Sequence, residues 1–155
     1  MNNPRRIFLK LTGQAGVLGA AWAAGLMASG AALAATWNKA GFSAKSVAEV
    51  MKSLGATGAA ESRDIIITAP DIAENGAVVP IAVSSKLPGT QQISILAEKN
   101  PFPLAATFDI SGGSEGYVSA RIKMGQTSDV WAVVKADGRF YTAKKEVKIT
   151  VGVCG

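Results

Sequence analysis

The chain has 155 residues, of which 16 are Lys or Arg and 11 are Asp or Glu, with 17 Gly, one Cys and no His. That length fits one domain with its own core. The absence of histidine excludes Ser-His and Cys-His nucleophile pairs and imidazole metal sites. The single cysteine excludes an internal disulfide, a C-x-x-C redox pair and a cysteine zinc site. Any chemistry therefore involves that cysteine, carboxylates or a partner protein.

The basic charge of the chain is concentrated at its N-terminus. Arg5, Arg6 and Lys10 are three of the 16 basic residues, so the rest of the chain carries 13 basic against 11 acidic residues. The remainder has no Lys/Arg block and no basic stripe with interleaved aromatics. Despite a pI of about 9.5, the sequence does not predict nucleic-acid binding.

Residues 1–34 have the features of an export signal. Arg5-Arg6 is followed by Ile7-Phe8-Leu9-Lys10, an uncharged stretch runs from 11 to 38, and Ala32-Leu33-Ala34 fits a signal peptidase site. The segment resembles a twin-arginine (Tat) signal, R-R-x-F-L-K. A retained transmembrane anchor is the alternative, but the stretch lacks dense Leu, Ile, Val and Phe. We expect cleavage near Ala34, a periplasmic mature protein without membrane attachment and, by analogy with Tat export of folded cargo, a partner subunit.

The mature chain is predicted to begin with a short helix. Ser46 and Glu49 form a capping box, Val47, Val50, Met51 and Leu54 recur at helical spacing, and Gly55 ends the helix. This helix is expected to pack its apolar face on another element.

Beyond Gly58, short β-branched segments alternate with turn residues such as Asn75-Gly76 and Asp137-Gly138. No connection is long enough for a helix, so the pattern predicts a mainly β, immunoglobulin-like antiparallel sandwich within a domain spanning residues 35–151. In 117–123, Val118, Ala120 and Ile122 are expected to face inward, and in the last strand Val147, Ile149 and Val151. The predicted strands are 64–68, 78–84, 92–96, 105–110, 117–123, 129–135, 139–142 and 146–151.

The only cysteine, Cys154, is the next-to-last residue and follows Gly152 and Val153. We call residues 152–155 the arm. A thiol at a glycine-flanked chain end in an oxidising compartment indicates a reactive or carrier thiol, an intermolecular disulfide or an incidental cysteine. An extended tail reaches on the order of 13 Å beyond the sandwich. Because the chain has no His and the terminal carboxylate disfavours a thiolate, activation is expected from a visiting enzyme.

The arm resembles that of the SoxY family of sulfur carriers, which ends in G-G-C-G-G. The resemblance extends through 69–80 (A-P-D-I-A-E-N-G-A-V-V-P), 99–104 (K-N-P-F-P-L) and 120–124 (A-R-I-K-M). It implies an immunoglobulin-like fold, a heterodimer with SoxZ and covalent attachment of sulfur intermediates to Cys154. It also implies a non-enzymatic role, in which partner enzymes of the Sox system conjugate thiosulfate to the cysteine, oxidise the bound sulfur and release sulfate.

Two positions of the arm depart from the family pattern. Val153 stands where the second glycine is expected, and no glycine follows Gly155. A β-branched residue beside the thiol stiffens and widens the arm.

Other candidate residues have simpler interpretations. Glu74 with Asn75 is read as a turn rather than a catalytic acid, and Asp109 with Glu115 as solvated charges rather than a glycosidase pair. Trp131 and Phe140 are interpreted as core or interface aromatics.

Rival functions for the chain are a structural subunit with a permanent disulfide at Cys154, and copper handling through Cys154 with Met51 or Met124. No cofactor and no metal site is predicted. The methionines are sparse for copper.

Overall fold

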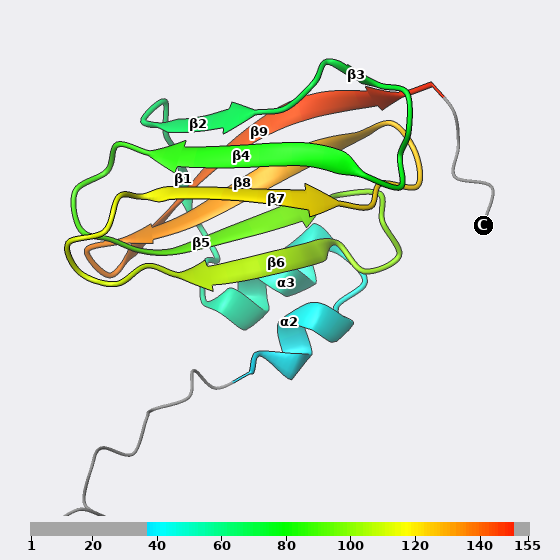
Figure 1. Ribbon diagram of the computed structural model, residues 1–155. Helices are drawn as coiled ribbons and strands as arrows, with labels where there is room; N and C mark the ends of the chain where they lie inside the picture. The colour runs from blue at the N-terminus through cyan, green and yellow to red at the C-terminus, as the bar shows by residue number, and fades with distance from the viewer. Residues whose placement is uncertain (1–36, 151–155) are drawn as a thin grey trace, which may run out of the picture. The chain divides into compact units, whose positions relative to one another are not determined.

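The computed structural model describes residues 37–150 (Figure 1). Two sheets pack face to face in this range, which confirms the predicted β-sandwich. The larger sheet has the order β1-β9-β8-β5-β6, with β3 also paired to β9, and the smaller sheet has the order β2-β4-β7. The strands are β1 Ala60–Glu61, β2 Ile65–Thr68, β3 Ile72–Ala73, β4 Val79–Ser85, β5 Thr90–Ala97, β6 Leu104–Asp109, β7 Tyr117–Ile122, β8 Ser128–Ala136 and β9 Arg139–Ile149.

The predicted helix is α3, Val47–Leu54. The Ser46 hydroxyl accepts a hydrogen bond from the Glu49 N–H at 3.2 Å, and Gly55 ends the helix in the left-handed region at φ +75°. The Glu49 carboxylate accepts from the N–H of Lys45, one residue before the cap, at 2.8 Å. Both predicted ends of this helix are confirmed.

A second helix, α2 (Lys39–Ser43), was not predicted. It has five residues and starts at Asn38, whose side-chain oxygen accepts from the Gly41 N–H at 2.9 Å. Gly41 is buried where α2 meets α3: a Cβ there would lie 2.8 Å from the Ser53 hydroxyl. A glycine in mid-helix and so short a segment leave no periodic pattern to detect.

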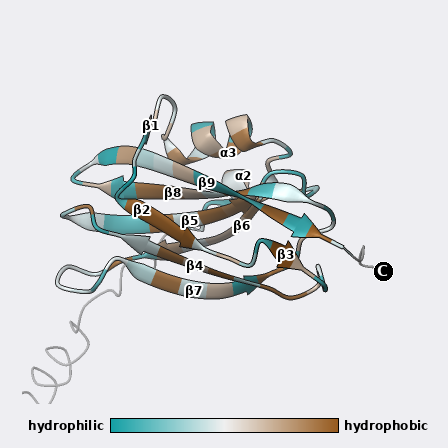
Figure 2. Cartoon of the chain, turned by 90° about the horizontal axis from the view of Figure 1, so that it is seen from above, coloured by the Kyte–Doolittle hydropathy of each residue, from teal (hydrophilic) through white to brown (hydrophobic). Residues whose placement is uncertain are grey.

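The helices cover the outer face of the larger sheet, so the fold has three layers (Figure 2). Val50 of α3 packs with Leu96 of β5 and Val133 of β8. The neighbours of these two strand residues face the other way: Ile95 and Val134 belong to the core between the sheets. Strands β5 and β8 are therefore buried on both faces, which explains their nearly continuous apolar sequence.

The strand expected at 117–123 is confirmed as β7, with Val118 and Ile122 buried and Ala120 half-buried against the same core. Its partner β4 pairs Val79 with Ile122. The β8–β9 hairpin turns on Asp137 and Gly138, both at positive φ. This is the Asp-Gly connection that suits a two-residue hairpin.

The division of the last strand into 139–142 and 146–151 was wrong. β9 is one strand, continuously paired with β8 from Arg139 to Val147. Alternation persists through the two lysines in its middle, because Lys144 is exposed while Lys145 is partly covered and binds the main chain of 69–71. Val147 is fully buried and Ile149 packs on the core, as predicted, whereas Val151 lies outside the described residues.

Two short strands that were not predicted, β1 and β3, pair with β9 in parallel, so the sandwich is not wholly antiparallel. Each has only two residues, too few for an alternating pattern. No helix within residues 37–150 is long and apolar enough to cross a membrane.

Candidate functional site

Cys154 lies outside the described residues, and the candidate site is built around the point where the described chain ends. Thr150 directly follows β9 and is four residues before the cysteine. Four extended residues span at most about 14 Å. The geometry of the last residues of β9 therefore fixes the origin from which the thiol can be presented.

The end of β9 is held on both sides. On one side, the Lys148 N–H donates to the Asp71 carbonyl at 3.0 Å and the Thr150 N–H donates to the Ala73 carbonyl at 3.2 Å. On the other side, the Ile149 N–H donates to the Thr127 hydroxyl at 2.9 Å. Because β8 begins only at Ser128, which pairs with Val147, this hydroxyl takes the place of a strand neighbour. Main-chain hydrogen bonds thus fix the chain as far as Thr150.

The segment leading into β3 is itself attached to β9. The Lys145 ammonium donates to the Ala69 carbonyl at 2.8 Å and lies 3.0 Å from the Asp71 carboxylate. The Asp71 side chain is largely exposed, so water screens this ion pair and it adds little stability. The hydrogen bond from Lys145 to the Ala69 carbonyl therefore does more to position this segment than the ion pair with Asp71 does.

The loops beside this end are joined to one another as well. Asn100 donates through its amide to the Lys123 carbonyl at 2.7 Å and accepts from the Gly125 N–H at 3.2 Å. The Met124 N–H donates to the Gly76 carbonyl at 2.7 Å. The three sequence segments at 69–80, 99–104 and 120–124 therefore converge at the end of the sandwich where β9 finishes, on the right in Figure 1.

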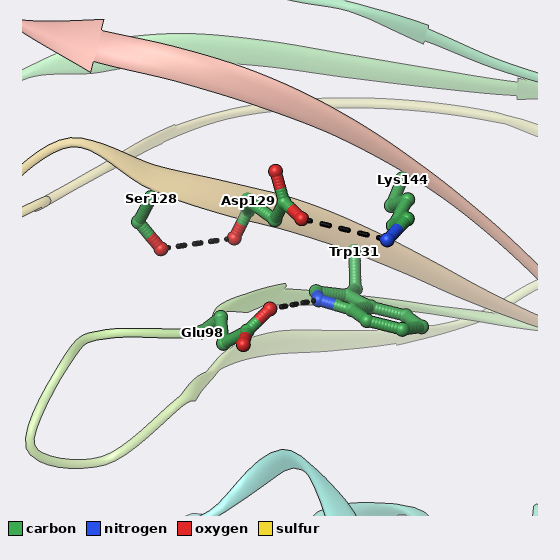
Figure 3. A network of polar contacts seen from close by, with 5 residues as sticks. All are labelled: Glu98, Ser128, Asp129, Trp131 and Lys144. Carbon is green, nitrogen blue, oxygen red and sulfur yellow. Dashed lines mark hydrogen bonds and ion pairs between the residues drawn. The ribbon is translucent and has the colours of Figure 1, made fainter.

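A polar network continues from this end along the helix-covered sheet (Figure 3). The Trp131 indole N–H donates to the Glu98 carboxylate at 2.8 Å, and the Lys144 ammonium lies over the indole ring, 5.4 Å from its centroid. Lys144 is also 3.7 Å from the Asp129 carboxylate. The Ser128 hydroxyl donates to the Asp129 carbonyl and accepts from the Lys99 N–H at 3.0 Å. These contacts tie the start of β8 to the 98–100 turn.

Most predicted site residues lie outside the described residues: Cys154, the arm positions Gly152, Val153 and Gly155, and the export pair Arg5 and Arg6. The structure does not test their roles. They stay predictions from the sequence.

The alternative residues are described and have structural roles. Asn75 forms the expected turn, with its side-chain oxygen accepting from the Ala77 N–H at 2.8 Å. Asp109 accepts from the Gln92 amide at 2.9 Å across strands β5 and β6. Trp131 and Phe140 pack partly buried against the helix layer, as predicted.

The two mature-chain methionines also pack on apolar residues. Met124 is fully buried in the core between the sheets, and Met51 packs against the helix-side core. Within residues 37–150, no cluster of three or more Cys, Asp or Glu side chains could hold a metal ion. Met124 therefore has a packing role in this fold.

Sequence reasoning missed Thr127 and the carbonyls of Asp71 and Ala73, which hold β9, and treated Asn100 only as a turn residue. Asn100-Pro101 did mark the turn. The bonding partners of Asn100 and Thr127 are more than 20 residues away, so no local pattern could identify them.

The model of the family described as sulfur oxidation protein SoxY matches residues 50–154. The solved structure of the sulfur carrier protein SoxY from Chlorobium limicola f thiosulfatophilum matches with 38% identity and a TM-score of 0.60, covering 69% of this chain and 94% of that one. Superoxide reductase (neelaredoxin) from Ignicoccus hospitalis matches with 21% identity and a TM-score of 0.50, covering 61% and 89%. This last likeness concerns the fold alone. No curated protein matches the chain in sequence.

Proposed function

The chain belongs to the SoxY family of sulfur oxidation proteins, and on that premise we propose that it holds thiosulfate-derived intermediates covalently on Cys154 and presents them to partner enzymes. A carrier role in sulfur oxidation follows from the family. The attachment residue and the mode of presentation are our proposal.

The observation that carries the proposal is the convergence of the three motif segments at the base of the arm. Hydrogen bonds to the Asp71 and Ala73 carbonyls of the first segment, together with one to the Thr127 hydroxyl, fix the chain up to Thr150, four residues before the only thiol. A carrier needs a fixed origin and a reactive group within reach of another protein's site. Val153 makes this arm stiffer than one with glycine on both sides of the cysteine.

The chemistry of the proposed loading step favours a substrate-like role over an enzymatic one. Joining a thiol to the outer sulfur of thiosulfate forms one S–S bond and releases one proton and two electrons. An electron acceptor in a partner enzyme must therefore take part. The chain has no His to act as a base for the thiol. The proposal accordingly assigns the oxidation to the enzyme that loads the cysteine.

A SoxZ-like subunit is proposed as the stable partner. The outer face of β2-β4-β7 is not covered by any described element, unlike the helix-covered face of the larger sheet. Ile66 on β2 and Tyr117 on β7 flank Ser84 in one row of this face and are 42% and 54% exposed. Exposed apolar side chains on a sheet face are typical of an interaction surface.

Export to the periplasm through the Tat pathway completes the proposal. Replacing both Arg5 and Arg6 by Lys should leave the precursor in the cytoplasm, because the pair lies in a complete R-R-x-F-L-K motif. Fractionation followed by detection of the protein measures this. Normal periplasmic accumulation of the double variant would refute the signal assignment.

The function is tested by Cys154→Ser. Thiosulfate-dependent turnover with the complete set of partner enzymes should be lost, while the melting temperature should stay nearly unchanged, because the core of the described residues is built without the arm. Val153→Gly is the matched variant and should keep turnover or raise it, since it removes a branched side chain next to the same thiol. Full turnover by Cys154→Ser would refute the proposal, because the chain has no other thiol.

A further inference from the structure

Three exposed apolar side chains belong to segments at the end of the sandwich where β9 finishes. Ile72, Val78 and Phe102 are 58%, 51% and 53% exposed. Ile72 belongs to β3, Val78 precedes β4, and Phe102 lies in the connection between β5 and β6. We call these three residues the end patch. They are three of the six large hydrophobic residues exposed in the described part of the chain.

The end patch stands on fixed main chain. Ile72 pairs with Lys148 at the end of β9. The Val78 N–H donates to the Asn75 carbonyl at 3.4 Å, and the following Val79 is fully buried. Phe102 stands between Asn100, which is bonded to Lys123 and Gly125, and the buried Pro103. Exposed apolar groups on fixed main chain at one end of the sandwich offer a surface on which another protein could bury apolar area.

The length of the arm limits how far from the end patch an enzyme that acts on Cys154 can stay. A catalytic group that reacts with Cys154 has to come within about 14 Å of Thr150, the longest span of four extended residues. Ile72 pairs with the strand only two residues before Thr150. An enzyme body surrounding its own active site cannot approach so closely without covering this end of the sandwich.

We propose that the end patch is the docking surface for the enzymes that act on Cys154, and that it contacts an apolar rim around the entrance of their active sites. This inference rests on the proposed carrier function. Docking by the body of the carrier brings the thiol to the entrance at high effective concentration, so the arm itself needs few contacts. One surface would serve successive enzymes, because each must reach the same cysteine.

The stable subunit and the enzymes then use different surfaces. Tyr117 begins β7 and Ile122 ends it, so the two are separated by roughly 17 Å of strand. Ile122 is adjacent to the 123–127 loop at the arm end, whereas Tyr117 lies toward the opposite end (Figure 1). Gln91, exposed at the start of β5 and bonded to the Gly138 N–H, provides a control that is remote both from the arm and from the surface proposed for SoxZ.

The test uses the heterodimer with SoxZ and the enzyme that conjugates thiosulfate to the carrier. In the double variant Val78→Ser, Phe102→Ser, the KM for the carrier should rise about tenfold with kcat unchanged, as expected when apolar contacts at a docking surface are truncated. Reaction of Cys154 with a small maleimide should keep its rate, because the arm is intact. The control Gln91→Ala, purified as the same heterodimer, should keep its KM, because Gln91 lies at the opposite end of the sandwich and outside the surface proposed for SoxZ.

Three results would overturn the inference. An unchanged KM in the end-patch variant, with Cys154→Ser inactive, would leave the carrier function standing without this docking surface. Loss of SoxZ from the end-patch variant would assign the patch to the stable subunit. A maleimide rate that falls together with enzyme loading would locate the effect in the arm.

If the double variant does not fold, Phe102 can be replaced by a photo-crosslinking phenylalanine analogue. This analogue should crosslink to the enzyme more than the same analogue at Tyr117. Equal crosslinking would contradict the proposal.

Discussion

The two ends of the sandwich are closed in different ways. At the arm end, side chains bind main chain from distant parts of the sequence: Asn100 reaches Lys123, and Thr127 reaches Ile149. At the opposite end, main-chain bonds such as that from the Asp137 N–H to the Gly89 carbonyl join distant segments, while side-chain bonds to the main chain are mostly local, such as the Thr90 hydroxyl donating to the Leu87 carbonyl at 2.9 Å. Among the bonds between side chain and main chain at that end of the described chain, the one from the Gly138 N–H to the Gln91 side chain is long-range.

Long-range hydrogen bonds between side chains and main chain are thus concentrated at the arm end. At the opposite end, the β8–β9 hairpin closes on the two-residue Asp137-Gly138 turn. By contrast, the arm end uses β3 and the Thr127 hydroxyl to hold three residues that extend past the start of β8. These bonds fix the chain that leads to the proposed carrier thiol.

The largest effect on this comparison is expected from Met124, which is fully buried directly beneath the arm-end loops. Met124→Ala should destabilise the protein by about 2–5 kcal/mol, through lost burial and a cavity. Met124→Leu keeps the volume and should cost less than about 1.5 kcal/mol. Urea unfolding measures both. Equal stability of the alanine variant and the wild type would mean that this residue does not support the arm end.

A smaller, more specific effect is expected from Thr127. Thr127→Val keeps the shape but removes the acceptor for the Ile149 N–H, which should cost about 1 kcal/mol. Amide hydrogen exchange should then accelerate at Ile149 and Thr150 by about fivefold, through easier local opening. Thr127→Ser restores the hydroxyl and should restore protection. Unchanged exchange in the valine variant would show that the hydroxyl does not hold the strand.

The smallest effect is expected at the opposite end. Gln91 is exposed, and its side-chain oxygen accepts from the Gly138 N–H at 3.3 Å. Gln91→Ala should change stability by no more than about 0.5 kcal/mol and leave exchange at Ile149 unaltered. Urea unfolding and amide exchange of this variant measure the difference between the two ends. Increased exchange at Ile149 would show that the ends are coupled, contrary to this account.

Much of the fold could be predicted because local patterns agree with it. Val118 and Ile122 alternate with exposed residues, and Ser46 and Gly55 are specific helix ends. The failures have local causes as well. β1 and β3 have two residues each, and Lys144-Lys145 interrupts the apolar pattern of β9 without interrupting its pairing.

The candidate site was predictable only in part. Cys154 could be singled out because it is the only thiol, next to the chain end. Thr127 could not, since nothing near it in the sequence indicates that its hydroxyl meets Ile149. The end patch was equally hidden, because Ile72, Val78 and Phe102 read as ordinary strand and turn residues until their exposure is known.

The most direct measurement is the intact mass of the mature protein, purified with its partner subunit from cells oxidising thiosulfate, before and after treatment with a reductant. If Cys154 carries sulfur, the intact mass should include a sulfur adduct that the reductant removes and that the Cys154→Ser variant lacks. A released polypeptide, a lost metal ion or an unchanged mass would contradict covalent carriage of sulfur on Cys154.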